Sequence, residues 1–82
     1  MTLSEILIQR WKAAFPDAQI ELTDTTGTND HWSLEIASEL FKGLSRLKQH
    51  QAIYKPIRDL IDSNQVHALN ITTYTPAEWR KR

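Results

Sequence analysis

The chain has 82 residues, with ten basic and ten acidic side chains, three histidines and no cysteine. A chain of this length buries only about 60% of its unfolded surface, which leaves a small core and little room for an enclosed active site. The lack of cysteine excludes disulfides and thiolate metal sites, and no apolar run approaches the roughly 18 residues of a membrane span. We therefore expect one soluble, cytoplasmic, non-enzymatic domain over residues 1–82, without a membrane anchor.

Charge is unevenly distributed along this neutral chain. Residues 1–41 hold seven acidic and two basic side chains, whereas residues 42–82 hold three acidic and eight basic ones. Such a basic segment can meet phosphate or an acidic partner, or it can form a solvated helix face that the acidic half balances. The candidate surface residues in this segment are Lys42, Arg46, Lys48, His50, Lys55 and Arg58.

Local patterns predict a helix and two strands in the first half. A capping box is present at Thr2-Leu3-Ser4-Glu5, and apolar residues then recur at helical spacing until Pro16 ends the helix. Residues 18–23 and 32–36 alternate between apolar and polar side chains, which is typical of half-buried strands. The polar loop over residues 24–31 indicates an antiparallel hairpin between them.

The second half begins with a single helical turn at residues 38–41 and a break at Gly43, which can adopt a left-handed backbone. Ser45 can cap a long helix, and Pro56 inside it predicts a kink or a break at Lys55. A turn at residues 62–65 leads to a third strand from Ala68 to Tyr74. The apolar stripe expected along the long helix is Leu47, His50, Tyr54, Ile57 and Ile61, flanked by Ile53 and Leu60.

A last helix is predicted after the third strand. Its start signal is Thr75-Pro76-Ala77-Glu78, which supplies a cap, a proline at the first helical position and a glutamate at the third, and Trp79 should fold back onto the body. The element order is α-β-β-α-α-β-α. Because helices connect the second and third strands, we expect these strands to be parallel through a right-handed crossover. The predicted fold is a two-layer α+β domain with a three-stranded mixed sheet.

Three histidines are the candidates for chemistry near neutral pH. His67 stands at the entry of the third strand and shares the parity of Leu69 and Ile71, which places it at the rim of the core face. His31 ends the hairpin loop, and His50 lies in the apolar stripe. Each also has a structural interpretation: His67 bonded to a turn carbonyl, His31 solvated in its loop, and His50 buried with its ring nitrogens hydrogen-bonded.

No self-contained catalytic or metal-binding motif is present. The chain has no nucleophile elbow, no phosphate-binding glycine loop, and no His-x-x-x-His or Glu-x-x-His spacing. These absences disfavour an enzyme and favour a binding module.

Four segments together resemble the BolA family. They are Phe41-Lys42-Gly43-Leu44-Ser45, Lys48-Gln49-His50-Gln51-Ala52-Ile53-Tyr54, His67-Ala68-Leu69 and Thr75-Pro76-Ala77-Glu78-Trp79. The resemblance covers nearly the whole chain, from the first helix to Trp79. The family fold is similar to a class II KH domain, which agrees with the predicted element order.

The resemblance implies a partner role in iron–sulfur trafficking or iron-status regulation. BolA-like proteins pair with monothiol glutaredoxins and share a [2Fe-2S] cluster, for which the glutaredoxin and a glutathione supply thiolates. The family's histidine ligand corresponds to His67, and a second ligand comes from the hairpin loop. Imidazole can replace thiolate on one iron of such a cluster. A chain without cysteine needs a thiolate-bearing partner, so the isolated protein is expected to carry no cluster.

The hairpin loop of this chain is shorter than in other members of the family. His31 is its soft ligand, and Asp24 and Asp30 are hard alternatives. His31 can also match a family position that is not a ligand, so the second ligand stays open at this point.

Nucleic-acid binding is the alternative function. Some BolA-like proteins are described as transcriptional regulators, and the basic residues between 42 and 58 would contact the phosphates of DNA. Against this, the Gly-x-x-Gly clamp of KH domains is missing and the net charge is zero. The same basic surface can face a glutaredoxin, and a metal-free adaptor is a third interpretation. We expect the free protein to be a monomer or a homodimer.

Overall fold

The computed structural model describes residues 1–82 and confirms the predicted order of helices and strands. The long second helix is divided into two α-helices by a 3₁₀ turn. The elements are α1 Leu3–Ala14, β1 Gln19–Asp24, β2 His31–Ala37, the 3₁₀ turn η1 Glu39–Phe41, α2 Arg46–Tyr54, the 3₁₀ turn η2 Lys55–Ile57, α3 Arg58–Asp62, β3 Ala68–Tyr74 and α4 Pro76–Lys81. None of the helices is long and apolar enough to cross a membrane.

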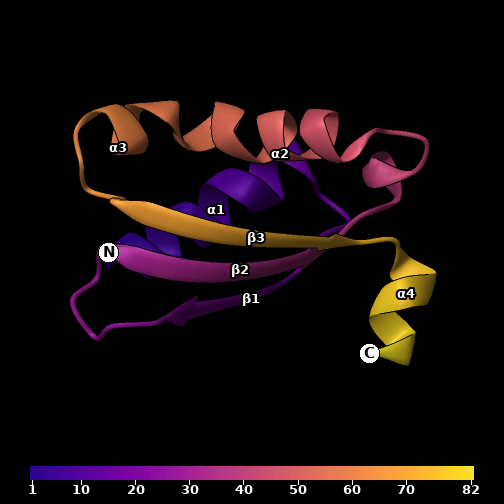
Figure 1. Ribbon diagram of the computed structural model, residues 1–82, viewed down its shortest axis with the longest axis horizontal. Helices are drawn as coiled ribbons and strands as arrows, with labels where there is room; N and C mark the ends of the chain where they lie inside the picture. The colour runs from indigo at the N-terminus through magenta and orange to yellow at the C-terminus, as the bar shows by residue number, and fades with distance from the viewer.

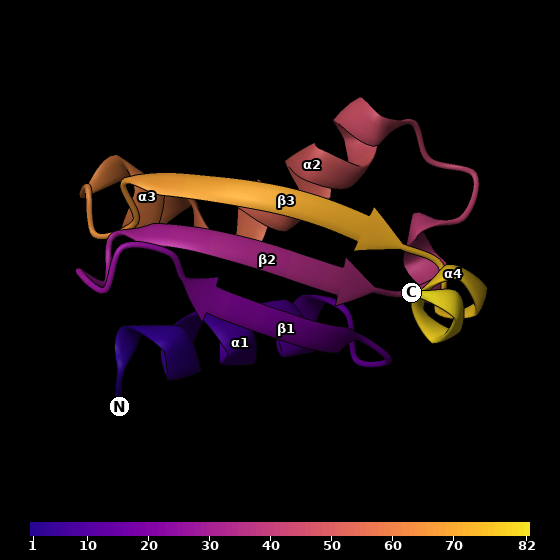
Figure 2. The ribbon, with the colours of Figure 1, turned by 60° about the horizontal axis from the view of Figure 1, so that its bottom comes forward.

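The three strands form one mixed sheet in the order β1-β2-β3. β1 pairs with β2 in the antiparallel sense, and β2 pairs with β3 in the parallel sense, as predicted. In Figures 1 and 2 the helices α1, α2 and α3 lie on one face of the sheet, and the other face is uncovered. The hairpin loop and the turn before β3 lie at one end of the molecule, and α4 lies at the opposite end (Figure 1).

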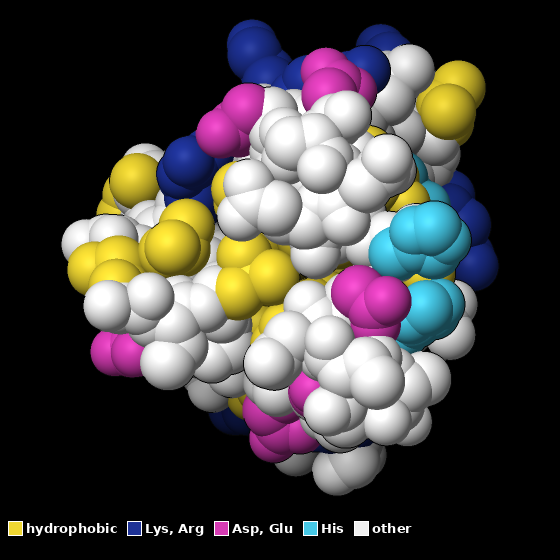
Figure 3. Space-filling view, turned by 90° about the vertical axis from the view of Figure 1, so that its left-hand side faces the viewer, with side chains coloured by type: hydrophobic (Ala, Val, Ile, Leu, Met, Phe, Trp, Pro, Cys, Tyr) yellow, Lys and Arg dark blue, Asp and Glu magenta, His cyan; other side chains and the backbone are white.

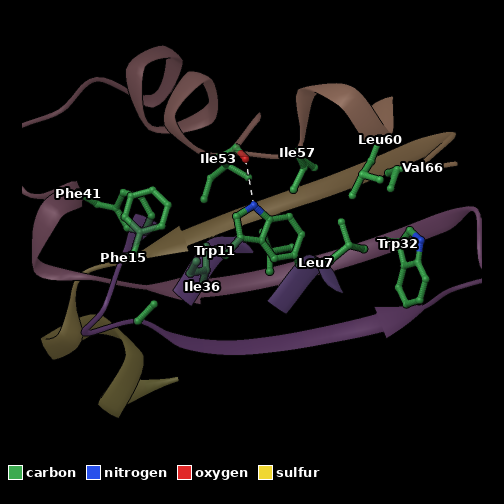
Figure 4. Packing of buried hydrophobic residues seen from close by; sticks show 12 residues of the cluster. Leu7, Trp11, Phe15, Trp32, Ile36, Phe41, Ile53, Ile57, Leu60 and Val66 are labelled. Atoms are coloured by element: carbon green, nitrogen blue, oxygen red, sulfur yellow. Dashed lines mark hydrogen bonds between the residues drawn. The ribbon is translucent and has the colours of Figure 1, made fainter. Parts of the chain in front are cut away.

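The core lies between the helices and the covered face of the sheet (Figure 4). Trp11 of α1 is completely buried at its centre, and its indole N–H donates a hydrogen bond of 3.0 Å to the carbonyl of Ile53. This bond satisfies a polar group that would otherwise be buried without a partner. The buried cluster consists of Leu7, Trp11, Phe15, Ala18, Trp32, Leu34, Ile36, Phe41, Ile53, Ile57, Leu60 and Val66.

The apolar stripe of the long second helix differs from the predicted one. Pro56 produces a break at Lys55 rather than a kink, because proline cannot donate to the helical hydrogen-bond ladder and the chain passes through the turn η2. The buried side chains are Ile53, Ile57 and Leu60, whereas Leu47 is 67% exposed, so its place in the stripe was predicted wrongly. His50 and Tyr54 are half-buried.

The polar residue Gln49 occupies the inner position that Leu47 was predicted to fill. Its amide N–H groups donate to the carbonyls of Phe41 and Leu44 at 3.1 and 3.2 Å, and its amide oxygen accepts from the hydroxyl of Thr73 at 2.5 Å. A polar side chain can be half-buried here because its hydrogen bonds are satisfied within the chain.

The open face of the sheet is polar and carries the C-terminal residue. The Arg82 guanidinium lies 3.5 Å from the centre of the Trp79 ring and 2.7 Å from a carboxylate oxygen of Glu21. Trp79 in turn meets Tyr74 edge-on, with ring centres 5.4 Å apart. α4 therefore folds back onto the end of the sheet, as the sequence predicted for Trp79.

Asp17 ties the turn after α1 to the turn after β2. Its carboxylate accepts hydrogen bonds from the hydroxyl of the buried Ser38 at 2.7 Å and from the backbone N–H of Glu39 at 2.8 Å. These two bonds hold the pKa of Asp17 below its ordinary value of 3.8. A carboxylate with a lowered pKa stabilises the fold above its unfolded-state pKa, and this contribution is lost as the pH falls through the folded-state pKa.

We therefore expect Asp17→Asn to lower the free energy of unfolding at neutral pH by about 1 kcal/mol at most, because the carboxylate is exposed and screened by solvent. The difference from the wild type should shrink as the pH falls through the lowered folded-state pKa of Asp17, because the wild-type carboxylate then becomes protonated. Urea unfolding followed by circular dichroism across this range measures both effects. A difference independent of pH would show that the charge of Asp17 contributes nothing.

Candidate metal centre

The two candidate metal ligands, His31 and His67, lie side by side. Their ring centres are 5.4 Å apart and their ring planes are inclined by 45°. The proximity follows from the parallel pairing of β2 and β3, which sets His31 opposite Ala68, so that the preceding residue, His67, reaches the same end of the sheet. Figure 3 shows histidine side chains next to one another on this end of the molecule, beside an acidic side chain.

Their positions differ slightly from those predicted. His31 is the first residue of β2 rather than the last residue of the loop, and its side chain is 39% exposed. His67 directly precedes β3 and is exposed. Both rings are therefore accessible to a second molecule.

Asp30 links the backbone of one histidine to the side chain of the other. Its carbonyl accepts hydrogen bonds from the backbone N–H groups of His67 at 2.7 Å and Ala68 at 3.0 Å. Its carboxylate oxygen Oδ1 lies 2.9 Å from Nδ1 of His31 and also accepts a hydrogen bond from the hydroxyl of Thr28. The Thr28 bond, followed by the His31 bond, holds the pKa of Asp30 below its ordinary value.

The side chain of Asp24 organises the hairpin loop. Its carboxylate accepts hydrogen bonds from the backbone N–H groups of Thr26, Gly27 and Asn29, at 3.3, 2.9 and 3.0 Å. Gly27 and Asn29 have positive φ angles of 76° and 62°, which both residue types tolerate. The carboxylates of Asp24 and Asp30 are therefore both engaged in hydrogen bonds, whereas Nε2 of His31, at the start of β2, accepts and donates none.

Trp32 holds the end of the loop against the core. The residue is 4% exposed, and its indole N–H donates to the carbonyl of Asn29 at 3.2 Å. A shallow hollow of about 260 Å³ adjoins His31 at this end of the sheet. Its lining residues are Thr25, His31, Trp32, Ala68, Leu69 and Asn70.

The spacing of the two rings fits two ligands of one metal ion. Two imidazoles bound to one tetrahedral ion, with metal–nitrogen bonds of about 2 Å, have ring centres roughly 5 Å apart. The observed separation of 5.4 Å is close to this value. No group of three or more His, Cys, Asp or Glu side chains is arranged to hold a metal ion in this chain. Two imidazoles are half of the four donors of a tetrahedral site, so a metal ion bound at this pair would need two further ligands from outside the chain.

The basic residues of the segment 42–58 are spread over different surroundings. Lys42 pairs with Glu39 at 2.9 Å, and Arg46 lines a polar hollow at the far end of β3 together with Gln49 and Glu78. No ion pair within 4.0 Å is formed by Arg46, Lys48, Lys55 or Arg58. His50 is half-buried on α2 and forms no part of the histidine pair.

Comparisons with known proteins place the chain in a family. The family described as BolA-like protein matches residues 4–78. The acid stress protein IbaG of Escherichia coli strain K12 is 41% identical over 56 residues, which make up 68% of this chain and 67% of that protein. An uncharacterized protein from the rpoN-murA intergenic region of Acinetobacter guillouiae is 40% identical over 78 residues, or 95% of this chain and 90% of the relative.

Solved structures agree with the sequence comparison. BolA1 from Arabidopsis thaliana superposes with a TM-score of 0.85 at 22% identity, covering 95% of this chain and 96% of that one, which shows the shared fold. The BolA domain of SufE1 from Arabidopsis thaliana gives a TM-score of 0.81 at 28% identity, covering 95% and 98% of the two chains. By sequence match and by fold, this chain belongs to the BolA family.

Proposed function

We propose that this protein is the histidine-bearing partner of a monothiol glutaredoxin, with which it shares a [2Fe-2S] cluster in iron–sulfur trafficking or iron-status regulation. The observation that supports the proposal is the pair formed by the half-buried His31 and the exposed His67, with ring centres 5.4 Å apart in a chain without cysteine. The role is non-enzymatic, because the chain offers ligands but no nucleophile or acid–base constellation.

The chemistry of the pair supports a shared cluster. Imidazole nitrogens replace thiolates on one iron of a [2Fe-2S] cluster and raise its reduction potential. In this arrangement His31 and His67 would hold one iron, and the glutaredoxin cysteine and a glutathione would hold the other. Because each molecule supplies only part of the donor set, the cluster would form only in the complex.

The complex itself provides the test. We expect the protein, co-expressed with a monothiol glutaredoxin in iron-replete cells, to co-purify as a coloured heterodimer containing glutathione. Its visible circular dichroism should differ from that of the glutaredoxin homodimer, because two thiolates are exchanged for imidazoles. A spectrum identical to that of the glutaredoxin alone, or two chains that separate on size exclusion, would contradict the proposal.

Binding of DNA is the second candidate function, and the observation that favours it is the set of unpaired cations Arg46, Lys48, Lys55 and Arg58. If these residues contact phosphates, duplex DNA should bind at low salt and dissociate as salt rises, because counterions are released on binding. Fluorescence anisotropy across a salt series measures this. If the double variant Arg46→Glu, Lys48→Glu binds DNA as tightly as the wild type, this surface is not a DNA-binding site.

A further inference from the structure

We infer that Asp30 is the positioning residue of the histidine pair, an inference that rests on the proposed function. Its carbonyl accepts the backbone N–H of His67 at 2.7 Å, and its carboxylate lies 2.9 Å from Nδ1 of His31. A single residue therefore contacts both histidines, through two different groups. Asp30 would act on a bound metal only indirectly, through the ring of His31 and the backbone of His67 that it holds.

The bond to His31 selects one tautomer of the ring. A carboxylate at neutral pH has no proton to donate, so the hydrogen in this bond must be carried by Nδ1 of His31. In the neutral ring the unprotonated nitrogen, which is the one able to bind a metal, is then Nε2. No hydrogen bond within the chain engages Nε2, so it remains free for a metal. A carboxylate behind a metal-bound histidine also raises the basicity of the ring and fixes its orientation.

The carboxylate is held in place before any partner arrives. The hydroxyl of Thr28 donates to the same oxygen of Asp30, and that hydroxyl lies 2.5 Å from the hydroxyl of Thr26. The side chain of Asp30 is 40% exposed, so it is partly sheltered by the loop around it. Because the carboxylate that holds the His31 ring is already fixed by hydrogen bonds, the ring loses less conformational freedom when it binds a metal. This preorganisation favours metal binding.

The carbonyl of Asp30 has a separate effect on His67. It receives two successive N–H groups, those of His67 and Ala68, and thereby joins the end of the loop to the start of β3. Because these bonds involve the backbone of residue 30, a substitution of its side chain leaves them in place. The variant Asp30→Ala therefore removes the support of the His31 ring without releasing the chain at His67.

The tautomer can be measured in the isolated protein, without a cluster. Long-range ¹H–¹⁵N correlation spectra of the histidine rings should show His31 of the wild type as the Nδ1–H form near neutral pH. In Asp30→Ala this preference should be lost, and Asp30→Asn, which keeps the shape and a neutral acceptor, should be intermediate. Asp62→Ala is the matched control, since Asp62 is an exposed aspartate whose carboxylate accepts no hydrogen bond within the chain.

The second measurement is the lifetime of the cluster in the glutaredoxin heterodimer against a chelator. Loss of a hydrogen-bond partner behind a metal ligand typically costs about 10- to 100-fold in metal affinity, so Asp30→Ala should shorten the lifetime by a factor in this range. Asp62→Ala should leave it unchanged. Backbone amide spectra of each variant establish that the fold is retained.

The outcomes separate the inference from the function on which it rests. A wild-type His31 in the Nε2–H form, or a tautomer that Asp30→Ala does not change, would overturn the positioning role even if the cluster forms normally. The same holds for a cluster lifetime that Asp30→Ala does not shorten. A wild-type heterodimer without any cluster would instead contradict the proposed function, and the ligand-positioning role with it.

Discussion

Replacing His67 with alanine should abolish the visible circular dichroism that distinguishes the heterodimer from the glutaredoxin homodimer. The substitution removes one of the two imidazoles that fit a single iron, and no other side chain of this chain is placed to replace it. The fold should be unaffected, because His67 is exposed. Its hydrogen bond to the carbonyl of Asp30 is donated by the backbone N–H, which the substitution leaves in place. We expect a change in the free energy of unfolding within about 0.5 kcal/mol.

The three histidines of the chain allow a controlled comparison. His50→Ala removes the same imidazole from a half-buried position on α2 and should leave the spectrum unchanged. His31→Ala should weaken the cluster as His67→Ala does, since His31 supplies the second ring of the pair. If His67→Ala preserves the heterodimer spectrum, His67 is not a ligand. If only His31→Ala preserves it, the second ligand lies elsewhere.

Replacing Trp11 with alanine should unfold much of the protein at 37 °C. The side chain is fully buried at the centre of the core, and truncation of a buried tryptophan to alanine costs about 3–5 kcal/mol. A domain of this length has a total stability of only about 4–12 kcal/mol, so the loss is a large share of it. Urea unfolding followed by circular dichroism measures the cost.

One further variant separates packing from hydrogen bonding at Trp11, and a second serves as a control. Trp11→Phe keeps an aromatic ring but leaves the Ile53 carbonyl without its 3.0 Å partner, and should cost about 1–3 kcal/mol. Trp79→Ala is the matched control, because Trp79 is half-buried at the end of the sheet. If Trp11→Ala costs no more than Trp79→Ala, the central role of Trp11 is wrong.

Local signals in the sequence were sufficient to predict the elements. The capping boxes at Thr2 and Thr75 are both formed, and Ser45 caps α2 by accepting from Lys48. The alternation of apolar and polar residues in β2 correctly predicts that Trp32 and the neighbouring apolar residues are buried. Such features depend on residues a few positions apart, so a single sequence contains the information needed to infer them.

Long-range features were harder to infer for a physical reason. Gln49 could replace Leu47 on the inner side of α2 because two carbonyls of the segment before the helix and the hydroxyl of Thr73 on β3 satisfy its amide, and the apolar spacing along the helix contains no sign of these partners. The contact between His31 and His67 depends on the register of β2 against β3, which the two segments do not specify separately. Asp30 was considered only as a hard ligand, because its role depends on that same register.

The parallel pairing of β2 and β3 also bears on how the protein folds. It joins His31 to Ala68, 37 positions further along the chain, whereas the hairpin of β1 and β2 closes over a few residues. Closing a long loop carries a larger entropy cost than closing a short one, so non-local strand pairs tend to form late. The two imidazoles therefore meet only in the completed fold. A nascent or misfolded chain lacks the histidine pair, so under the proposed function iron capture would be confined to molecules that have finished folding.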